Sequence, residues 1–345
     1  MTEVETTLHN LLTAAVDSRG AASASLIQRP GAEPDTVWLP ACDHEPSFLA
    51  YSITKVFLAV VVLQMCERGQ MDLDDPLARW CPNIPAAERI SVRRLLNHTA
   101  GIPDYGRIPA YHEGVRTTPS MPWSFHRFAA ETFEHGLSFE PGAGWSYSNP
   151  GYMLVKHIAE AVAGASFRDL LADRIARPLG LARTFVAESL DDLGSLAPGV
   201  SRVLSADGGT RDVRQHYHPG WVSHGVVAST ASDLARFLDR LFSGMVLSTG
   251  SLEAMRTLVP VALDPPPRGG RPGYGLGLMG DLASSPDVLG HNGGGPGYAA
   301  SAFHAAGRGA SACVMGAIED DFRPEAVVLA MLSRVVPGRR KGGVA

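Results

Sequence analysis

Lysine is almost absent from this 345-residue chain. Only Lys55, Lys156 and Lys341 are lysine among its 30 basic residues, and the remainder are arginine. No basic run interrupts the body of the chain and the formal net charge is −5, so nothing indicates a nucleic-acid partner. The short basic run 339–341 precedes two glycines and is expected to be a frayed end.

Cysteine is also scarce. The cysteines show neither a C-x-x-C pair nor the spacing of a zinc finger; they are Cys42, Cys66, Cys81 and Cys313. His216, His218 and His224 could together bind zinc, but no carboxylate or cysteine lies at ligand spacing beside them. We therefore expect no metal and no cofactor, with these histidines in a surface loop or at the edge of a pocket.

Three further absences narrow the function. The apolar run 56–65 is too short to cross a bilayer. The N-terminus is acidic and lacks the basic and apolar regions of a leader. A Gly-x-Ser-x-Gly elbow, which carries the nucleophile of α/β-hydrolases, is absent. These features predict a soluble, cytoplasmic protein without a membrane partner, and they argue against the α/β-hydrolase fold.

Composition and periodicity indicate an ordinary globular protein longer than one average domain, with 45% apolar and 19% charged residues. Helical spacing and capping residues predict helices over residues 4–18, 52–69, 90–97, 123–133, 152–162, 166–177, 229–244, 252–258 and 324–335. Strand patterns cover residues 22–28, 36–39, 274–279, 288–291, 298–305 and 311–318. Residues 265–273 show no periodicity and are expected to be a loop.

These elements predict an α+β fold. An antiparallel sheet flanked by helices, an α/β sandwich, is expected from residues 1–75 and 206–345. Strand signals are scarce between residues 98 and 205, so residues 76–205 are expected to form a mostly helical inserted domain. An active site would then lie in the cleft between the two domains.

Ser52 and Lys55 are the strongest candidates for chemistry. They begin an apolar helix and lie one turn apart on the same face. Burial can depress the pKa of a lysine until it accepts the serine proton, and the free N–H groups of a first helical turn favour an oxyanion. The alternative is a serine cap followed by a solvated lysine, although a lysine leading into an almost wholly apolar helix is unusual on a solvated face.

Two other segments carry polar groups in irregular sequence. Tyr147 precedes Asn149 by two residues, and a neighbouring ammonium could lower the pKa of the Tyr147 phenol until it acts as a base. Asn149 could then hold the lysine and a substrate carbonyl, whereas ordinary turn chemistry is the alternative. The glycine-rich run 290–297 is either a plain hairpin or a strand edge that lies against a substrate.

The three motifs, in this order, resemble those of the serine β-lactamase / penicillin-binding-protein-like family. They are Ser52-Ile-Thr-Lys55, Tyr147-Ser-Asn149 and His291-Asn-Gly293. The resemblance is closest to the branch of class C β-lactamases, D-aminopeptidases, carboxylesterases and transesterases, and it extends to segments 95–105, 139–142, 227–234 and 274–277. It implies the β-lactamase/transpeptidase-like fold and catalysis through an acyl-enzyme.

The resemblance also implies a role for each matched residue. Ser52 corresponds to the acylated nucleophile, Lys55 and Tyr147 to the pair that manages its proton, and Asn149 to an orienting amide. Gly294, which follows the third motif, corresponds to the residue whose N–H completes an oxyanion hole with that of Ser52. Neither a metal nor a cofactor is implied.

His291 departs from the pattern of the β-lactamases and DD-peptidases, which usually have a lysine there to meet the substrate carboxylate. The charge of a histidine at neutral pH depends on its surroundings. This pattern is similar to that of the esterase, D-amidase and transesterase members. Asn292 and Gly293 of the same motif are expected to contact substrate. Weaker candidates for the substrate pocket are Tyr105, Trp123, Trp221 and His224, with core packing as the alternative for the aromatic residues.

Three functions remain open. The first is a hydrolase of esters or amides, with D-amino-acid substrates included. The second is an acyltransferase, transesterase or peptide cyclase that passes the same acyl group to an alcohol or amine. The third is a binding protein without catalysis, against which the intact Ser52, Lys55, Tyr147 and Asn149 argue. The expected partner is a small-molecule or peptidyl acyl substrate, with a carrier-bound thioester as a further candidate; a β-lactamase or DD-peptidase is disfavoured.

Overall fold

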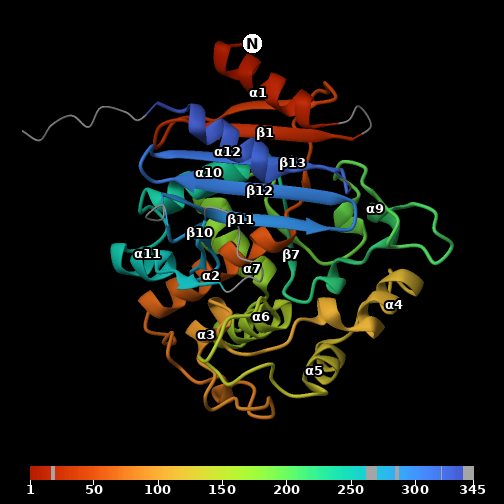
Figure 1. Cartoon of the computed structure of the whole chain (residues 1–345), viewed down its shortest axis with the longest axis vertical. Coiled ribbons are helices and arrows are strands. Elements are labelled where there is room, and N and C mark those ends of the chain that lie inside the picture. Colours follow the sequence, from red (N-terminus) through yellow and green to blue (C-terminus); the bar gives the residue numbers. More distant parts are fainter. Residues whose placement is uncertain (17–19, 262–269, 284–286, 320, 337–345) are drawn as a thin grey trace, which may run out of the picture.

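A computed structural model of the chain describes residues 1–16, 20–261, 270–283, 287–319 and 321–336. At its centre lies an antiparallel sheet with the strand order β2-β1-β13-β12-β11-β10-β9-β8. Figure 1 shows that both ends of the chain contribute, because β1 lies beside β13. The strands are β1 (Ala22–Ile27), β2 (Asp35–Leu39), β8 (Val259–Pro260), β9 (Pro272–Tyr274), β10 (Met279–Asp281), β11 (Val288–Gly295), β12 (Tyr298–Ala305) and β13 (Ala310–Gly316).

Helices cover both faces of this sheet. α1 (Glu3–Ala15) and α12 (Pro324–Arg334) pack on one face, and α10 (Ala231–Phe242) packs on the other (Figure 1). In β13, Val314 joins the apolar cluster under α1 and α12, whereas Cys313 joins the cluster on the opposite side. Because both faces are covered, the whole strand is buried, and its sequence is mostly apolar rather than alternating, with Ser311 as the one polar residue.

The middle of the chain forms a layer of helices beyond one edge of the sheet (Figure 1). Its helices are α3 (Val92–Leu96), α4 (Pro109–Thr117), α5 (Phe125–Phe133) and α6 (Asn149–Ala163). They are followed by α7 (Phe167–Leu171), which contacts α2 (Thr54–Glu67) and α6, and by α8 (Arg177–Leu179), which contacts α10. The following part of the chain adds α9 (Val213–His216) and α11 (Thr249–Arg256). Smaller antiparallel sheets join β3 (Phe48–Leu49), β7 (Val226–Ser229) and β4 (Phe185–Ala187), and separately β5 (Val200–Ser201) and β6 (Arg211–Asp212).

One helix is buried in the interior of the protein. α2 (Thr54–Glu67) is buried from Thr54 to Met65 and contacts α6, α7 and α11. Its apolar residues cover its whole circumference, as in helices that lie inside large proteins. Each large apolar side chain buried there contributes about 1.5–3 kcal/mol. The first turn of α2, which carries Lys55, is therefore held firmly inside the protein.

The α+β architecture predicted from the sequence is confirmed, with an antiparallel sheet flanked by helices and a helical layer beside it. The exact domain boundaries at 75/76 and 205/206 stay a prediction. Within the described ranges, no helix is both long and apolar enough to cross a membrane.

Several local predictions differ from the structure. Residues 274–279 form the end of β9, a turn and the start of β10 instead of one strand. The turn contains Gly277 at φ +78°, where a Cβ would lie 2.9 Å from the carbonyl oxygen of Lys55, so the site requires glycine. The sequence did not predict α4, because this helix is mostly polar and only its Val115 is buried. Most of the predicted loop 265–273 lies outside the described residues.

Candidate active site

Ser52 lies in a 3₁₀ turn, Tyr51–Ile53, that leads directly into α2. Its neighbour Tyr51 has φ +44°, a left-handed conformation that is strained for a side chain of this size. The Tyr51 hydroxyl donates a 2.6 Å hydrogen bond to the carbonyl of Pro296, and its ring is buried against Gly295. The hairpin between β11 and β12 thereby holds the turn that presents Ser52.

Lys55 is completely buried one turn after Ser52. Its Nζ lies 3.1 Å from Ser52 Oγ, 2.8 Å from Asn149 Oδ1 and 3.2 Å from His224 Nε2. Burial lowers the pKa of the Lys55 ammonium well below its ordinary value, and the charge of Asp104 opposes this shift. An amine that can lose its proton at 3.1 Å from a hydroxyl is suited to act as its base.

The hydroxyl of Tyr147 donates a 2.8 Å hydrogen bond to Ser52 Oγ from the opposite side of the site. Burial raises the pKa of the Tyr147 phenol above its ordinary value, and the hydrogen bond with Ser52 opposes this only in part. The direction is opposite to the phenolate suggested by the sequence, because burial and the charge of Asp104 both disfavour the anion. Tyr147 is therefore a neutral phenol that can pass on a proton.

Asn149 is the first residue of α6 and joins Lys55 to a carboxylate that the sequence reasoning missed. Its side-chain nitrogen Nδ2 and its backbone N–H donate to Asp104 Oδ1, at 3.0 and 2.8 Å. Because Nδ2 is directed at the carboxylate, Oδ1 must face Lys55. Asp104 lies in the matched segment 95–105, but its role depends on contact with α6, which spacing alone does not reveal.

His291 lies on β11, where the predicted strand 288–291 continues to Gly295. Its Nε2 lies 2.9 Å from the Tyr274 hydroxyl, and its Nδ1 lies 2.5 Å from the Asn292 carbonyl oxygen. Burial, reinforced by the Lys55 charge, lowers the pKa of His291 to about 3. The first position of the third motif is therefore uncharged at neutral pH. The Asn292 side chain accepts a 2.7 Å hydrogen bond from Ser301.

The glycines after Asn292 bring β11 against the turn of Ser52. A Cβ on Gly293 would lie 2.1 Å from the carbonyl oxygen of Ala50 and 3.4 Å from the backbone nitrogen of Ser52. Only glycine permits this approach. A Cβ on Gly294 would instead meet nothing within 4 Å. The strand edge at Gly294 thus faces open space next to the nucleophile.

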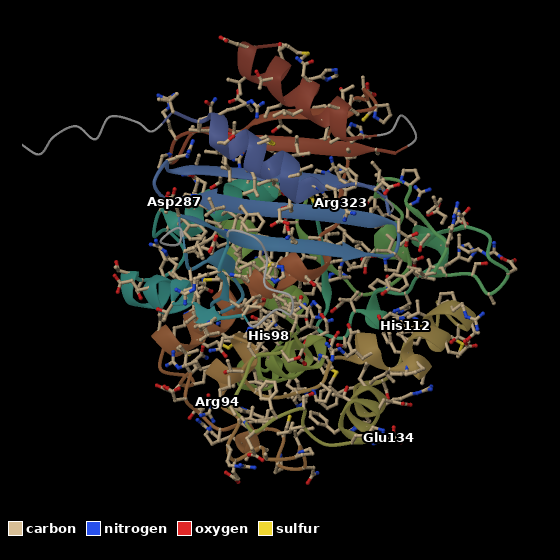
Figure 2. All side chains as sticks on the ribbon, in the orientation of Figure 1. Arg94, His98, His112, Glu134, Asp287 and Arg323 are labelled. Carbon is tan, nitrogen blue, oxygen red and sulfur yellow. The ribbon has the colours of Figure 1, made fainter. Side chains whose placement is uncertain are left out.

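A cavity of about 550 Å³ opens at this point. It is lined by Ser52 and Tyr147, by residues 291–294 of β11 and by residues 322–326 at the start of α12. Arg323, which Figure 2 labels beside α12, and Glu325 bring opposite charges to its wall, and both are exposed. The site thus combines a serine, a proton-accepting amine, a phenol and a substrate-sized space.

His98 is another residue that motif reasoning did not select. It lies between the sheet and α6 (Figure 2), is buried, and accepts a 3.2 Å hydrogen bond from the backbone N–H of Ser148 through Nδ1. Its ring centroid is 4.5 Å from that of Tyr147 and 4.6 Å from that of Tyr274. His98 therefore supports the loop that carries Tyr147.

The structure does not bring the predicted aromatic pocket residues to the cavity beside Ser52. Tyr105 is 5% exposed and packs against Tyr111 and Phe128. Trp221 is 0% exposed, and its indole N–H donates to the carbonyl of Pro119. Side chains with so little exposed surface pack in an aromatic core of the helical layer, which was the alternative interpretation for them.

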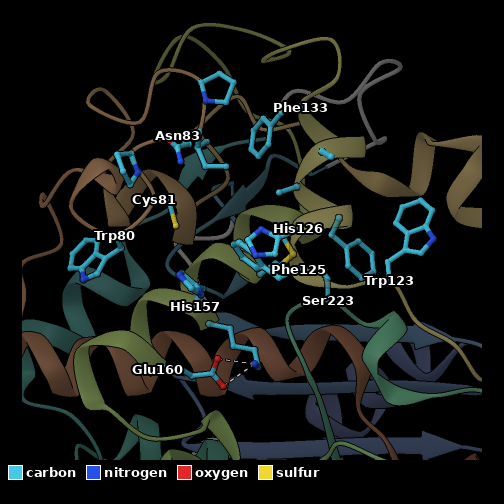
Figure 3. Close-up of a pocket in the computed structure, with 18 of the residues that line it drawn as sticks. Trp80, Cys81, Asn83, Trp123, Phe125, His126, Phe133, His157, Glu160 and Ser223 are labelled. Atoms are coloured by element: carbon cyan, nitrogen blue, oxygen red, sulfur yellow. Dashed lines mark hydrogen bonds and ion pairs between the residues drawn. The ribbon is translucent and has the colours of Figure 1, made fainter.

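Trp123 lines a different cavity, of about 900 Å³, between α5, α6 and residues 80–85. Figure 3 shows this cavity with Phe125, His126 and His157 on its walls and the Lys156–Glu160 ion pair at its edge. No lining residue is shared with the cavity beside Ser52. It is therefore a separate feature of the helical layer.

The three histidines considered for zinc have separate partners. His216 Nδ1 lies 2.9 Å from the Asp212 carbonyl oxygen, and His218 Nδ1 accepts from the Gly220 N–H. His224 Nε2 contacts Lys55 instead of facing the cavity. Across the described part of the chain, no group of three or more His, Cys, Asp or Glu side chains is arranged to share a metal ion.

Comparison with known proteins shows the family to which this chain belongs. A profile of the β-lactamase family matches residues 10–340. The chain belongs to the β-lactamase family. The family predicted from the three motifs is therefore confirmed.

Three proteins illustrate the relationship. Penicillin-binding protein 4* of Bacillus subtilis is 32% identical over 72% of this chain and 55% of its own length. Lovastatin esterase of Penicillium rubens is 26% identical over 59% of this chain and 57% of its own length. The chain thus spans little more than half of these curated relatives. The crystal structure of a D-stereospecific amidohydrolase from Streptomyces sp. superposes with a TM-score of 0.82 at 30% identity, covering 95% of this chain and 98% of that one.

Proposed function

We propose that this β-lactamase-family protein is a serine hydrolase that cleaves esters or amides, D-amino-acid derivatives among them, through an acyl-enzyme on Ser52. One observation carries the proposal: Ser52 Oγ lies within hydrogen-bond distance of both Lys55 Nζ and the Tyr147 hydroxyl, at a substrate-sized cavity. The esterase and the D-stereospecific amidohydrolase among its relatives support these substrate classes.

The first half-reaction follows from these positions. Ser52 Oγ attacks the substrate carbonyl carbon while Lys55, as a free amine, takes the hydroxyl proton. The Tyr147 phenol hands a proton to the leaving alcohol or amine and regains one from the Lys55 ammonium. The carbonyl oxygen becomes an oxyanion, for which the N–H groups of Ser52 and Gly294 are the proposed donors. Each donor of this kind typically lowers the barrier by about 3 kcal/mol.

In the second half-reaction, water attacks the acyl group on Ser52. Tyr147 and Lys55 then take the water proton and return one to Ser52 Oγ, which restores the starting state. No step in this cycle requires a metal or an organic cofactor. The uncharged His291 leaves the cavity without the lysine that β-lactamases and DD-peptidases direct at a carboxylate, which favours neutral acyl groups next to Ser52.

An acyltransferase, transesterase or cyclase remains the second candidate, because an alcohol or amine can replace water in the last step. The cavity wall at Arg323 and Glu325 is exposed, so a second substrate has access to the acyl group. A small-molecule or peptidyl acyl group is the proposed donor, and a carrier-bound thioester is the donor proposed for a transferase.

The test combines trapping with competition. Intact mass after incubation with a fluorophosphonate and with activated esters should show a single adduct that Ser52→Ala does not form. Absence of any adduct on the wild type would contradict the proposal. Product ratios with rising amine or alcohol then separate the two candidates: hydrolysis alone supports the hydrolase, and growing transfer product supports the transferase.

A further inference from the structure

The base of the proposed reaction is held in an unusual way. A free amine has two N–H bonds and one lone pair, and it can take the Ser52 proton only if the lone pair points at Ser52 Oγ. Among the described residues, Lys55 Nζ has three neighbours within hydrogen-bond distance: Ser52 Oγ, Asn149 Oδ1 and His224 Nε2. The two N–H bonds of the amine diverge, so only one of them can point at Asn149 Oδ1, and the second needs another acceptor.

His224 is placed to be that acceptor. It is 1% exposed, and its Nε2 lies 3.2 Å from Lys55 Nζ. Its Nδ1 has no partner among the described residues. Burial and the charge of Lys55 lower the pKa of His224 well below its ordinary value, which keeps the ring neutral. A neutral imidazole has one protonated and one bare nitrogen, so its tautomer decides whether Nε2 accepts or donates.

We infer that His224 is a positioning residue for Lys55, an inference that rests on the proposed function. Its bare Nε2 accepts one N–H of the free amine while Asn149 Oδ1 accepts the other, and the lone pair is thereby directed at Ser52 Oγ. The ring proton is on Nδ1. The opposite tautomer would donate from Nε2 into the lone pair and block the base.

The surroundings of this pair contain several other titratable groups. These groups belong to neighbouring elements and are Asp104, His98, His291, Lys156, Tyr147, Tyr152 and Tyr274. Asp104 is the only carboxylic acid among these groups, and the Asn149 side chain lies between it and Lys55. Lys55 is thus held by neutral acceptors, which orient the amine without fixing its proton as a carboxylate would.

Two variants of His224 separate positioning from simple packing. His224→Leu fills the space but offers no acceptor, whereas His224→Gln keeps an acceptor near the position of Nε2. The measurement is the rate constant for labelling of Ser52 by an excess of a fluorophosphonate, taken as a function of pH. With the probe in excess, this rate constant does not depend on how much of the sample is active. We expect His224→Leu to be slower by about tenfold or more. We also expect the midpoint of its acid limb to fall, because the Lys55 ammonium loses an acceptor.

We expect His224→Gln to remain within about threefold of the wild type, less than the loss from removing a proton-transfer partner. Equal rates and equal acid limbs for His224→Leu and the wild type would overturn the inference. So would a His224→Gln variant as slow as His224→Leu.

The tautomer gives a readout that does not depend on activity, and it decides the matter if His224→Leu fails to fold. In ¹⁵N-labelled wild-type protein, the His224 ring nitrogens can be assigned by their absence from the His224→Gln spectrum. A neutral ring protonated on Nδ1 is expected. A ring protonated on Nε2, or an imidazolium, would overturn the inference. A wild type that no probe labels would instead contradict the proposed function, while the tautomer would still be measured.

Discussion

The hydroxyl of Tyr147 donates a 2.8 Å hydrogen bond to Ser52 Oγ, across the site from the Lys55 amine at 3.1 Å. Ser52 therefore has one neighbour that can take its proton and another that can give one to the leaving group. Tyr147 comes from the loop before α6 and Ser52 from the turn before α2, so the packing of α6 on α2 brings them together.

Replacing Tyr147 with phenylalanine removes the hydroxyl and keeps the ring against His98. We expect kcat/KM for an activated ester to fall by about 10²–10⁴-fold, because a proton carrier has been lost. Tyr111→Phe is the matched control, since the Tyr111 hydroxyl forms its hydrogen bonds inside the helical layer, to the Trp221 carbonyl at 3.4 Å among others, away from the cavity. Steady-state kinetics of both variants check this expectation. Equal losses in the two would contradict it.

Asp104 changes the pKa of the proposed base, Lys55, through its charge and not through a direct hydrogen bond. Its negative charge raises the pKa of Lys55 and also that of Tyr147. In Asp104→Asn the pKa of Lys55 should therefore fall, and the acid limb of the pH–rate profile should move to lower pH. The rate should fall as well, because the charge-assisted hydrogen bonds that orient Asn149 become neutral ones. A profile that keeps its acid limb in place would count against this role.

Gly293 and Gly294 form a matched pair for a backbone test. In Gly293→Ala, the Cβ would lie 2.1 Å from the Ala50 carbonyl oxygen, so β11 must move away from Ser52. We expect acylation to slow by about 10²-fold, as for other misplacements of about 1 Å. Gly294→Ala places its Cβ in the open space of the cavity, so urea unfolding should show wild-type stability for this variant and a loss of stability for Gly293→Ala.

The buried histidine His304 should make stability depend on pH. Burial lowers its pKa from 6.5 to about 4 in the folded protein, where it bonds to Ser311 and stacks on Phe242. Between these two values the unfolded chain binds the proton and the folded chain does not, so stability is lost as the pH falls through this window. The slope from one such group is at most about 1.4 kcal/mol per pH unit.

The matched measurement is urea unfolding of the wild type and of His304→Gln across the same window. The free energy of unfolding should fall less steeply with decreasing pH in the variant. His304 lies outside the site, so labelling of Ser52 should be unaffected. Parallel curves for the two proteins would show that His304 does not titrate as its burial implies.

The sequence reasoning placed residues correctly where the contact is local in the chain. Ser52 and Lys55 are linked by helical spacing, and β13 was predicted from a short, mostly apolar run. It failed where function depends on contacts between distant segments. Asp104 reaches Asn149 across 45 positions and His224 reaches Lys55 across 169, and neither distance leaves a pattern in the chain.

The aromatic residues show that residue type alone does not locate a side chain in the fold. Tyr105 and Trp221 have side chains that suit a substrate pocket, but they lie in the core of the helical layer. Their residue type predicted apolar surroundings, but it did not tell a substrate pocket from the protein core. The packing of α4 and α5 around them decides this.

The claim that Ser52 is acylated is tested most directly by locating the adduct. The wild-type protein is treated with an activated ester, quenched in acid and digested, and the peptide that carries the acyl group is sequenced by mass spectrometry. We expect one acyl group for each chain, on Ser52, and none on the Ser52→Ala variant. An acyl group on another residue, or equal labelling of Ser52→Ala, would contradict the account.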